Sequence, residues 1–235
     1  MKLGGMQPYF FPYLGYFAVI KHTDKWIIAD NVQFMGGSWI ERNRILKSQA
    51  GWNYIRVPLE KSPYTIPINK KRIRTNENWQ RKIFSQLVLY KKIAPYYHQV
   101  IDLLDHVFSS HTNSIVELNT RGIKAVCEYL GLPFTYILAS RLDVDLKKIK
   151  EPDDWPLEIC LLLGADEYIN PPGGKSFYNK DKFERNQVRL KFLQVNLLPY
   201  QQNGHPFEPG LSILDVMMFN SIDKINEMLD EYEFL

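Results

Sequence analysis

The residues best suited to chemistry lie near the start of the chain, and the most distinctive of them form one turn. Between positions 7 and 17, a glutamine, two prolines, a glycine and several aromatic residues are gathered. Proline fixes φ and glycine permits close backbone approach, so this composition predicts a shaped turn. Such turns, at the end of a first strand, commonly bind ligands in α/β proteins. The candidate substrate contacts here are Gln7, Tyr9, Pro12, Gly15 and Tyr16.

Within this turn, we expect Gln7 to hydrogen-bond a nucleotide or sugar that packs against Tyr9 and Tyr16. The alternative is a rigid structural corner under the sheet, built from the same prolines and rings. The ligand interpretation is favoured because packing does not require a side chain that both donates and accepts hydrogen bonds, as Gln7 does.

A second polar cluster contains Trp39, Arg42, Asn43 and Arg44. On a strand, Arg42 and Arg44 share one face while Asn43 points to the other. Two guanidinium groups on one face could bind a pyrophosphate bidentately, and Trp39 offers a stacking plane beside them. A solvated strand face with salt bridges is the alternative.

Candidates for proton transfer are Asp30 and His205. Asp30 and Gln33 follow the second predicted strand, a position where a carboxylate often holds a ribose hydroxyl or a substrate amine. The alternative for Asp30 is a turn-forming Asp-Asn pair. His205 stands between a glycine and a proline, in a polar stretch where a base could reach a substrate.

A Gly-Gly-Lys-Ser segment at 173–176 suggests a loop that presents Gly174, Lys175 and Ser176 to an anionic ligand. It lacks the spaced glycine of a true phosphate-binding loop and directly follows two prolines. A plain surface turn is therefore the alternative. The histidines and cysteines show no metal-ligand spacing, so the sequence predicts no metal site.

The elements that must position these residues begin with a βαβ unit. A short strand at 2–7, a helix at 13–22 and an apolar strand at 26–29 fit this unit. Residues 32–59 then alternate polar and apolar, which predicts two or three antiparallel strands. The period becomes helical from 78 to about 132.

The remaining predicted elements are strands at 134–139, 168–169 and 190–195, a helix at 156–164 and a closing helical segment at 212–229. Together these patterns predict an α/β fold with a mixed sheet, an N-terminal βαβ unit, an antiparallel segment and an inserted helical layer. The composition has no break sharp enough for a linker, so we expect a single domain over residues 1–235.

The bulk composition is that of an ordinary globular protein, with 45% hydrophobic and 23% charged residues and a net charge of +3. This mild charge does not indicate a nucleic-acid partner. No apolar run approaches the roughly 20 residues that cross a bilayer, so we expect no membrane partner and a cytoplasmic location. Cys127 and Cys160 fall in apolar helical patterns, which predicts buried thiols.

These residues together resemble the WbqC-like proteins, bacterial proteins often encoded in O-antigen and other surface-polysaccharide clusters. The resemblance runs nearly end to end. Its matching segments are QPYFFPYLGYF at 7–17, Val32-Gln33-Phe34 with the acidic residue before it, 39–45, Gly164-Ala165, Tyr168-Ile169, 211–215 and Asn220. The family pattern tends to place two aspartates where this chain has Asp30-Asn31.

The resemblance implies transfer of an acyl or aminoacyl group, such as glycyl, to the amino group of a nucleotide-linked aminodeoxy sugar during polysaccharide assembly. The donor would be an activated aminoacyl compound, made with ATP or supplied as aminoacyl-tRNA, which is the one nucleic-acid partner expected. A non-catalytic sugar-nucleotide-binding or scaffold protein of the same pathway is the alternative. Exposed aromatics in the antiparallel segment also leave an oligomer open.

Overall fold

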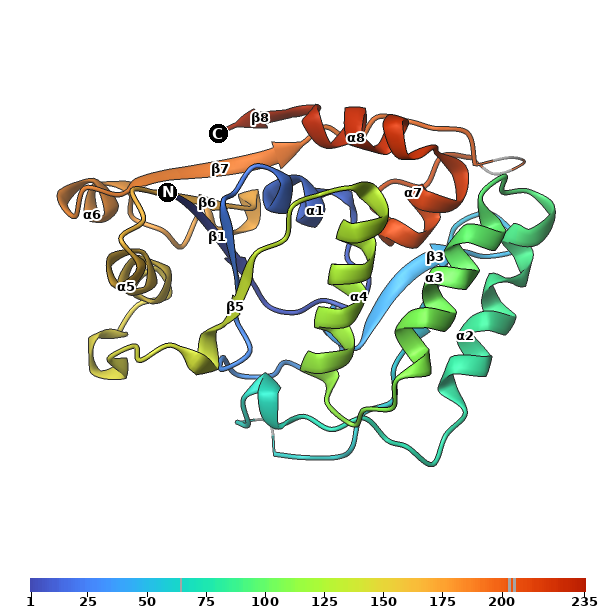
Figure 1. Cartoon of the computed structure of the whole chain (residues 1–235), viewed down its shortest axis with the longest axis horizontal. Coiled ribbons are helices and arrows are strands. Elements are labelled where there is room, and N and C mark those ends of the chain that lie inside the picture. The colour runs from blue at the N-terminus through green and yellow to red at the C-terminus, as the bar shows by residue number, and fades with distance from the viewer. Residues whose placement is uncertain (64, 203, 205) are drawn as a thin grey trace.

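In the computed structural model, which describes every residue except 64, 203 and 205, a six-stranded sheet forms the centre of the described chain. Its strand order is β5-β2-β1-β6-β7-β8, and all neighbours are parallel except β7 and β8 (Figure 1). The strands are β1 (Lys2–Met6), β2 (Lys25–Ile28), β5 (Tyr136–Leu138), β6 (Glu167–Asn170), β7 (Arg189–Val195) and β8 (Tyr232–Phe234).

Helices cover both faces of this sheet, because consecutive residues of its central strands are apolar and point to opposite faces. In β2, Trp26 and Ile28 join one core cluster while Ile27 joins the other. The first cluster lies under α1 (Leu14–Lys21), α4 (Ile115–Leu130), α7 (Ile213–Phe219) and α8 (Ile222–Asp230). The second lies under α5 (Asp154–Leu163) and α6 (Lys180–Arg185), which Figure 1 shows on the other side of β6. This is the doubly wound arrangement.

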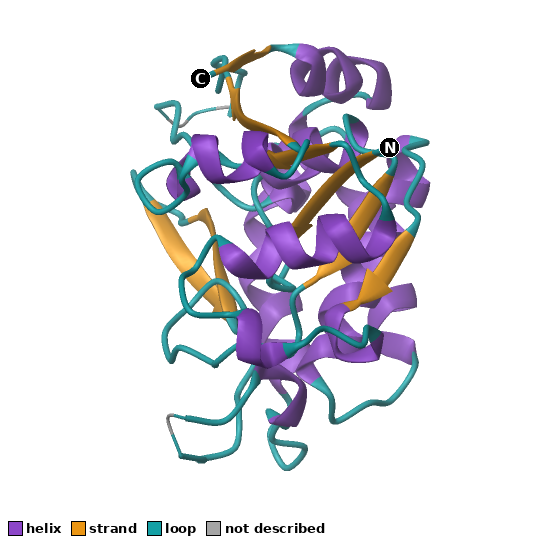
Figure 2. Cartoon of the chain, turned by 90° about the vertical axis from the view of Figure 1, so that its left-hand side faces the viewer, coloured by secondary structure: helices purple, strands orange, loops and turns teal. Residues whose placement is uncertain are grey.

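The segment between β2 and β5 forms the predicted antiparallel pair and inserted helical layer. Strands β3 (Arg42–Leu46) and β4 (Trp52–Arg56) make a ribbon apart from the main sheet (Figure 2). After the ribbon, α2 (Trp79–Leu87) and α3 (Tyr97–Ser109) precede α4. Short 3-10 helices occupy Ile68–Lys70, Val88–Lys92, Ala139–Arg141, Leu146–Lys148 and Pro172–Gly174.

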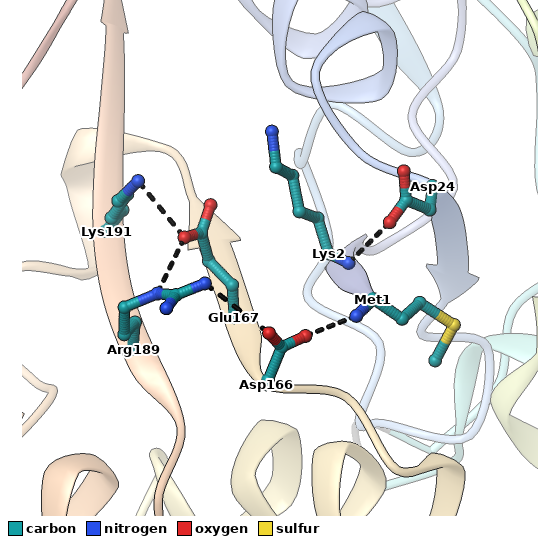
Figure 3. A network of polar contacts seen from close by, with 7 residues as sticks. All are labelled: Met1, Lys2, Asp24, Asp166, Glu167, Arg189 and Lys191. Carbon is teal, nitrogen blue, oxygen red and sulfur yellow. Dashed lines mark hydrogen bonds and ion pairs between the residues drawn. The ribbon is translucent and has the colours of Figure 1, made fainter.

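The amino ends of the parallel strands are joined by charged groups (Figure 3). Glu167 at the start of β6 is buried, and one of its carboxylate oxygens lies 3.1 Å from both Arg189 Nε and Lys191 Nζ of β7. Asp166 contacts the Met1 amino group, and the Lys2 amide donates to Asp24 at 2.7 Å. Charge pairing thus occupies the edge opposite to the strands' carboxyl ends.

The α/β fold class is confirmed, including the N-terminal βαβ unit, the antiparallel segment and the inserted helices. Helix α6 and strand β8 are additional to the predicted elements. The closing segment forms two helices instead of one, because Ser221 begins α8 by accepting a hydrogen bond from the Lys224 amide. In the part of the chain that the structure describes, no helix is long and apolar enough to cross a membrane.

The second core cluster contains a stack of rings from Tyr168, Tyr178 and Phe183. Burial raises the pKa of Tyr178 from 10.0 to about 12. The unfolded chain therefore releases the Tyr178 proton first as the pH rises above about 10.

We predict that Tyr178→Phe makes the free energy of unfolding less sensitive to alkali. The free energy of unfolding of the wild type should fall as the pH rises from 10 to 12, because in this window only the unfolded state loses the Tyr178 proton. In the variant, this decrease should be smaller by about 1.4 kcal/mol per pH unit. Urea unfolding at stepped pH measures this, with Tyr136→Phe on the exposed edge strand as control. Equal slopes in all three proteins would contradict the prediction.

Candidate functional site

A pocket of about 410 Å³ lies at the carboxyl ends of β1, β6 and β7. Strand β2, which follows β1 in the chain, pairs with one side of β1, and β6 pairs with its other side. The helices that follow β1 and β6 in the chain, α1 and α6, cover opposite faces of the sheet. This is the topological switch point, where open α/β sheets bind ligands. The lining residues are Met6, Tyr9, Pro12, Tyr13, Trp39, Asn43, Arg44, Pro171, Pro172, Gly173, Leu197 and Gly210. We call this the switch-point pocket.

One wall of the switch-point pocket is the turn at 7–13, whose carbonyl groups are held by buried side chains. Asn119 Nδ2 of α4 donates to Pro8 O at 2.7 Å and to Ile40 O at 2.8 Å. Asn43 Nδ2 of β3 donates to Phe10 O at 3.0 Å and to Phe11 O at 2.8 Å. Buried carbonyls need such partners, so these amides fix the path of the turn.

Phe11 needs this support because its φ is +40°, a conformation that residues with side chains rarely adopt. Ser212 Oγ at the start of α7 adds a hydrogen bond to Phe11 O at 2.7 Å. The Phe11 ring packs against α4, where a Cβ on Gly122 would lie 3.3 Å from it. Strained backbone of this kind persists where its surroundings over-determine it, often at functional sites.

Gly15 serves the turn by making room for a neighbouring ring. A Cβ on this residue would lie 2.5 Å from the Tyr13 ring, so only glycine lets that ring lie across the first turn of α1. Tyr13 therefore reaches the switch-point pocket, while Tyr16 turns inward, is fully buried and donates its hydroxyl to Gln7 O at 3.1 Å.

The positive charge of the switch-point pocket belongs to Arg44. Its guanidinium carbon lies 5.5 Å from the Trp39 ring centre and 5.3 Å from that of Trp52. One terminal nitrogen donates to Gly210 O at 2.7 Å, and Nε is buried without a hydrogen-bond partner. Arg44 forms no ion pair with any described carboxylate, so its charge is held by rings and a carbonyl alone.

As predicted, Arg42 and Arg44 lie on one face of the ribbon, where they pair across the strands with Arg56 and Tyr54. Arg42, however, packs over the Tyr54 ring at 4.1 Å and does not line the switch-point pocket. Asn43 points to the other side and holds the turn. The ribbon thus brings one guanidinium to the pocket, next to Trp39, which is 38% exposed.

Two phenols complete the polar lining. Burial raises the pKa of Tyr9, with a smaller contribution from neighbouring Tyr13, and burial also raises the pKa of Tyr13. Both hydroxyls therefore stay protonated at neutral pH and can donate hydrogen bonds. Among the described lining residues there is no carboxylate, histidine or cysteine.

Behind the switch-point pocket, a buried carboxylate anchors the segment that ends at Gly210. Asp215 accepts hydrogen bonds from the hydroxyls of Tyr90 and Tyr200, each at 2.5 Å, and from Gln202 Nε2 at 2.8 Å. Burial, followed by the Asp215 charge, raises the pKa of both tyrosines. Gln202 in turn accepts from the Glu208 amide at 2.7 Å, which fixes the approach to the carbonyl that holds Arg44.

Asp30 lies at the end of β2, beside a different cavity of about 520 Å³. Its two carboxylate oxygens accept hydrogen bonds from the Ser140 amide at 2.8 Å and the Ser140 hydroxyl at 2.6 Å. The structure therefore does not bring Asp30 together with Arg44 in one pocket, although both lie toward the carboxyl edge of the sheet.

The other predicted site residues are divided between the pocket and its surroundings. Pro12 lines it, and the loop after β6 contributes Gly173 and its two preceding prolines. Gly174 packs against Asn170, and Lys175 and Ser176 are exposed outside the lining. Gln33 is exposed beside Pro67. His205 lies outside the described residues. In the described chain, no cluster of three or more potential ligand side chains could hold a metal ion.

Sequence reasoning missed Asn119, Trp52 and Tyr13 as contributors to the site. Asn119 is separated from its acceptor at Pro8 by 111 positions, so no local pattern links them. Trp52 could have been found, because an antiparallel ribbon with a turn near Gly51 places its ring next to the face of Arg44.

The fold and the pocket define a class: doubly wound α/β proteins with a ligand-type pocket at the switch point. Within that class, the chain belongs to the WbqC-like protein family, whose model matches residues 7–227. A relative from Mycobacterium tuberculosis (strain ATCC 25618 / H37Rv), the uncharacterised protein Rv1507c, is 28% identical over 222 residues, covering 93% of each chain. No solved structure matches the chain.

We predict that Asn119→Ala lowers the free energy of unfolding by about 2–4 kcal/mol, because Pro8 O and Ile40 O are left buried without donors. Urea denaturation measures the change. Asn226→Ala is the matched control, since its amide also donates to two carbonyls but at a more exposed position. It should cost about 1 kcal/mol or less. Equal losses in both variants would refute the role assigned to Asn119.

Proposed function

We propose that the switch-point pocket binds a nucleotide-linked aminodeoxy sugar and that the protein transfers an acyl or aminoacyl group, such as glycyl, to the sugar's amine. The observation that carries this proposal is the Arg44 guanidinium, which is partly buried, lies over two indole rings and forms no ion pair with any described carboxylate. A cation held in this way lacks its counter-charge, and a diphosphate supplies one.

The rest of the lining supports the same ligand. Tyr9 and Tyr13 offer protonated hydroxyls to phosphate oxygens, and the described lining holds no acidic side chain that would repel them. Trp39 presents an exposed ring on which a base or a sugar can stack. A volume of about 410 Å³ lies within the range of small-molecule sites.

The proposed reaction forms a bond between the amine nitrogen and the carbonyl carbon of the donor, and breaks the bond from that carbon to its leaving oxygen. The nitrogen loses a proton in the process, so a base must receive it. We assign this role to Asp30, with His205 as the second candidate. The acyl donor is activated with ATP or arrives as an aminoacyl ester, and we place the reaction in the cytoplasm, in surface-polysaccharide assembly.

A binding protein without catalysis is the second candidate. It is favoured by one observation: the described lining of the switch-point pocket contains no carboxylate, histidine or cysteine that could transfer a proton or form a covalent intermediate. In that case the protein would hold the sugar nucleotide for a partner of the same pathway.

A mass-spectrometric assay separates the two. The purified protein receives a nucleotide-linked 4-amino-4,6-dideoxy sugar with glycine and ATP, or with glycyl-tRNA. A product heavier by one glycyl group is expected, and the successful donor identifies the activation chemistry. Sugar-nucleotide binding without product would favour the binding protein. If neither product nor sugar-nucleotide binding is found, both candidates are rejected.

We predict that Arg44→Met weakens the binding of thymidine diphosphate by about 10- to 100-fold, because a charge-assisted contact with the diphosphate is lost. Isothermal titration calorimetry measures the affinity. Arg56→Met is the matched control: this arginine is exposed on the same ribbon and does not line the switch-point pocket. Its affinity should equal that of the wild type, and a similar loss in both variants would show that only general charge matters.

A further inference from the structure

The cavity beside Asp30 forms a second site at the carboxyl ends of β2 and β5. Its volume is about 520 Å³, and Asp30, Asn69, Thr120, Leu138 and Arg141 contribute to its lining. Ile28 of β2 pairs with Met6 of β1 and with Leu138 of β5, so this cavity lies on the same edge of the sheet as the switch-point pocket. We call it the Asp30 cavity.

Its central feature is a carboxylate without a cation. Asp30 is 1% exposed, and its carboxylate accepts hydrogen bonds from the backbone amide and the hydroxyl of Ser140, both neutral. No lysine, arginine or histidine of the described chain forms an ion pair with it. Arg121 and Lys124 also line the cavity, but they pair with Glu117 and Glu128. A buried charge is costly unless a counter-charge is present.

Two further oxygen atoms in this cavity are buried without any hydrogen-bond partner: Asn69 Oδ1 and Thr120 Oγ1. Thr120 is 8% exposed and lies within α4, where threonine hydroxyls commonly bond to a carbonyl of the preceding turn. The backbone N–H of Asn69 donates to the backbone carbonyl of Asp30 at 2.8 Å, which holds this residue beside the carboxylate. Unsatisfied buried polar atoms are uncommon in folded proteins, and two line one cavity here.

We infer that the Asp30 cavity is a binding site for a primary ammonium group. An ammonium brings the missing positive charge to Asp30 and carries three N–H donors, which match the carboxylate, Asn69 Oδ1 and Thr120 Oγ1. A neutral donor would satisfy the oxygens but leave the carboxylate without a counter-charge. Arg141, exposed at the rim, is available to an anionic part of the same ligand.

This inference rests on the proposed function and deepens it, because it identifies where the acceptor's amine binds. Adjacent strands lie about 4.8 Å apart, so the ends of β6 and β2, on either side of β1, are separated by roughly 10 Å. A sugar held by its diphosphate near Arg44 can extend along the sheet edge toward Asp30. Asp30 then contacts the nitrogen that must lose a proton.

The test uses ethylammonium as the probe and the full chain as the protein, with ligand-observed NMR to measure affinity. Tetramethylammonium, which carries the charge but no N–H donor, is the comparison ligand. Wild-type protein should bind ethylammonium and bind tetramethylammonium at least about 10-fold more weakly. Equal binding of the two ions, or no binding of ethylammonium, would overturn the inference.

Thr120→Val is the decisive variant, because it keeps the side-chain shape and removes only a hydroxyl that has no partner. Its stability should equal or exceed that of the wild type, while ethylammonium binds about 5- to 10-fold more weakly. Thr23→Val is the matched control: that buried hydroxyl donates to Val19 O and Ile20 O within its own helix end. It should lose stability and keep ethylammonium affinity. Unchanged affinity in Thr120→Val would reject the site.

Asn69→Ala and Asp30→Asn extend the series, with losses of about 5- to 10-fold and more than about 10-fold expected for ethylammonium. Thymidine diphosphate binding, measured on the same samples, separates the two proposals. If wild-type protein binds the diphosphate but no variant changes ethylammonium affinity, the ammonium site fails and the nucleotide pocket stands. If ethylammonium binding follows the expected series but the diphosphate does not bind, the ammonium site stands and the proposed function fails.

Discussion

The structure depends on one constraint: in the turn at 7–13, the carbonyl groups of residues 7, 8, 10 and 11 accept hydrogen bonds from side chains and not from the backbone of a strand or helix. Side chains from separate elements provide the donors, namely Asn43 of β3, Tyr16 of α1, Asn119 of α4 and Ser212 at the start of α7. These bonds join the ribbon, the inserted helices and the last helices to the end of β1. The same turn presents Tyr9 and Tyr13 to the switch-point pocket, so the architecture and the site share their anchors.

The two edges of the sheet are specialised in opposite ways. At the amino edge, carboxylates and cations pair with one another. At the carboxyl edge, neither Arg44 nor Asp30 forms an ion pair with a residue that the structure describes, and the two line separate cavities. Unbalanced charges of both signs along one edge suit a ligand that carries both a diphosphate and an amine. A protein without a ligand would gain stability by pairing or removing them.

Much of this arrangement could be predicted from local patterns. The buried run at Trp26–Ile28 and the alternation around Arg42–Arg44 gave the right strands, and the proline-rich turn marked one wall of the pocket. What failed were relations between distant residues: Asn119 with Pro8, and Asp30 with Ser140, are both more than a hundred positions apart. Such contacts leave no period in the sequence. Tyr16 was expected at the ligand but is buried, because its ring packs in the core against Trp26.

The ion pairs at the amino edge give the molecule an uneven response to salt. Arg189 and Asp166 there are largely exposed, so dissolved ions screen their attraction. The screening distance, the Debye length, shortens from about 10 Å at 0.1 M ionic strength to about 3 Å at 1 M. The turn at the opposite edge is held by amides and hydroxyls, which carry no net charge for ions to screen. Rising ionic strength therefore weakens the exposed ion pairs at the amino end, while the hydrogen bonds that hold the turn beside the switch-point pocket are little affected.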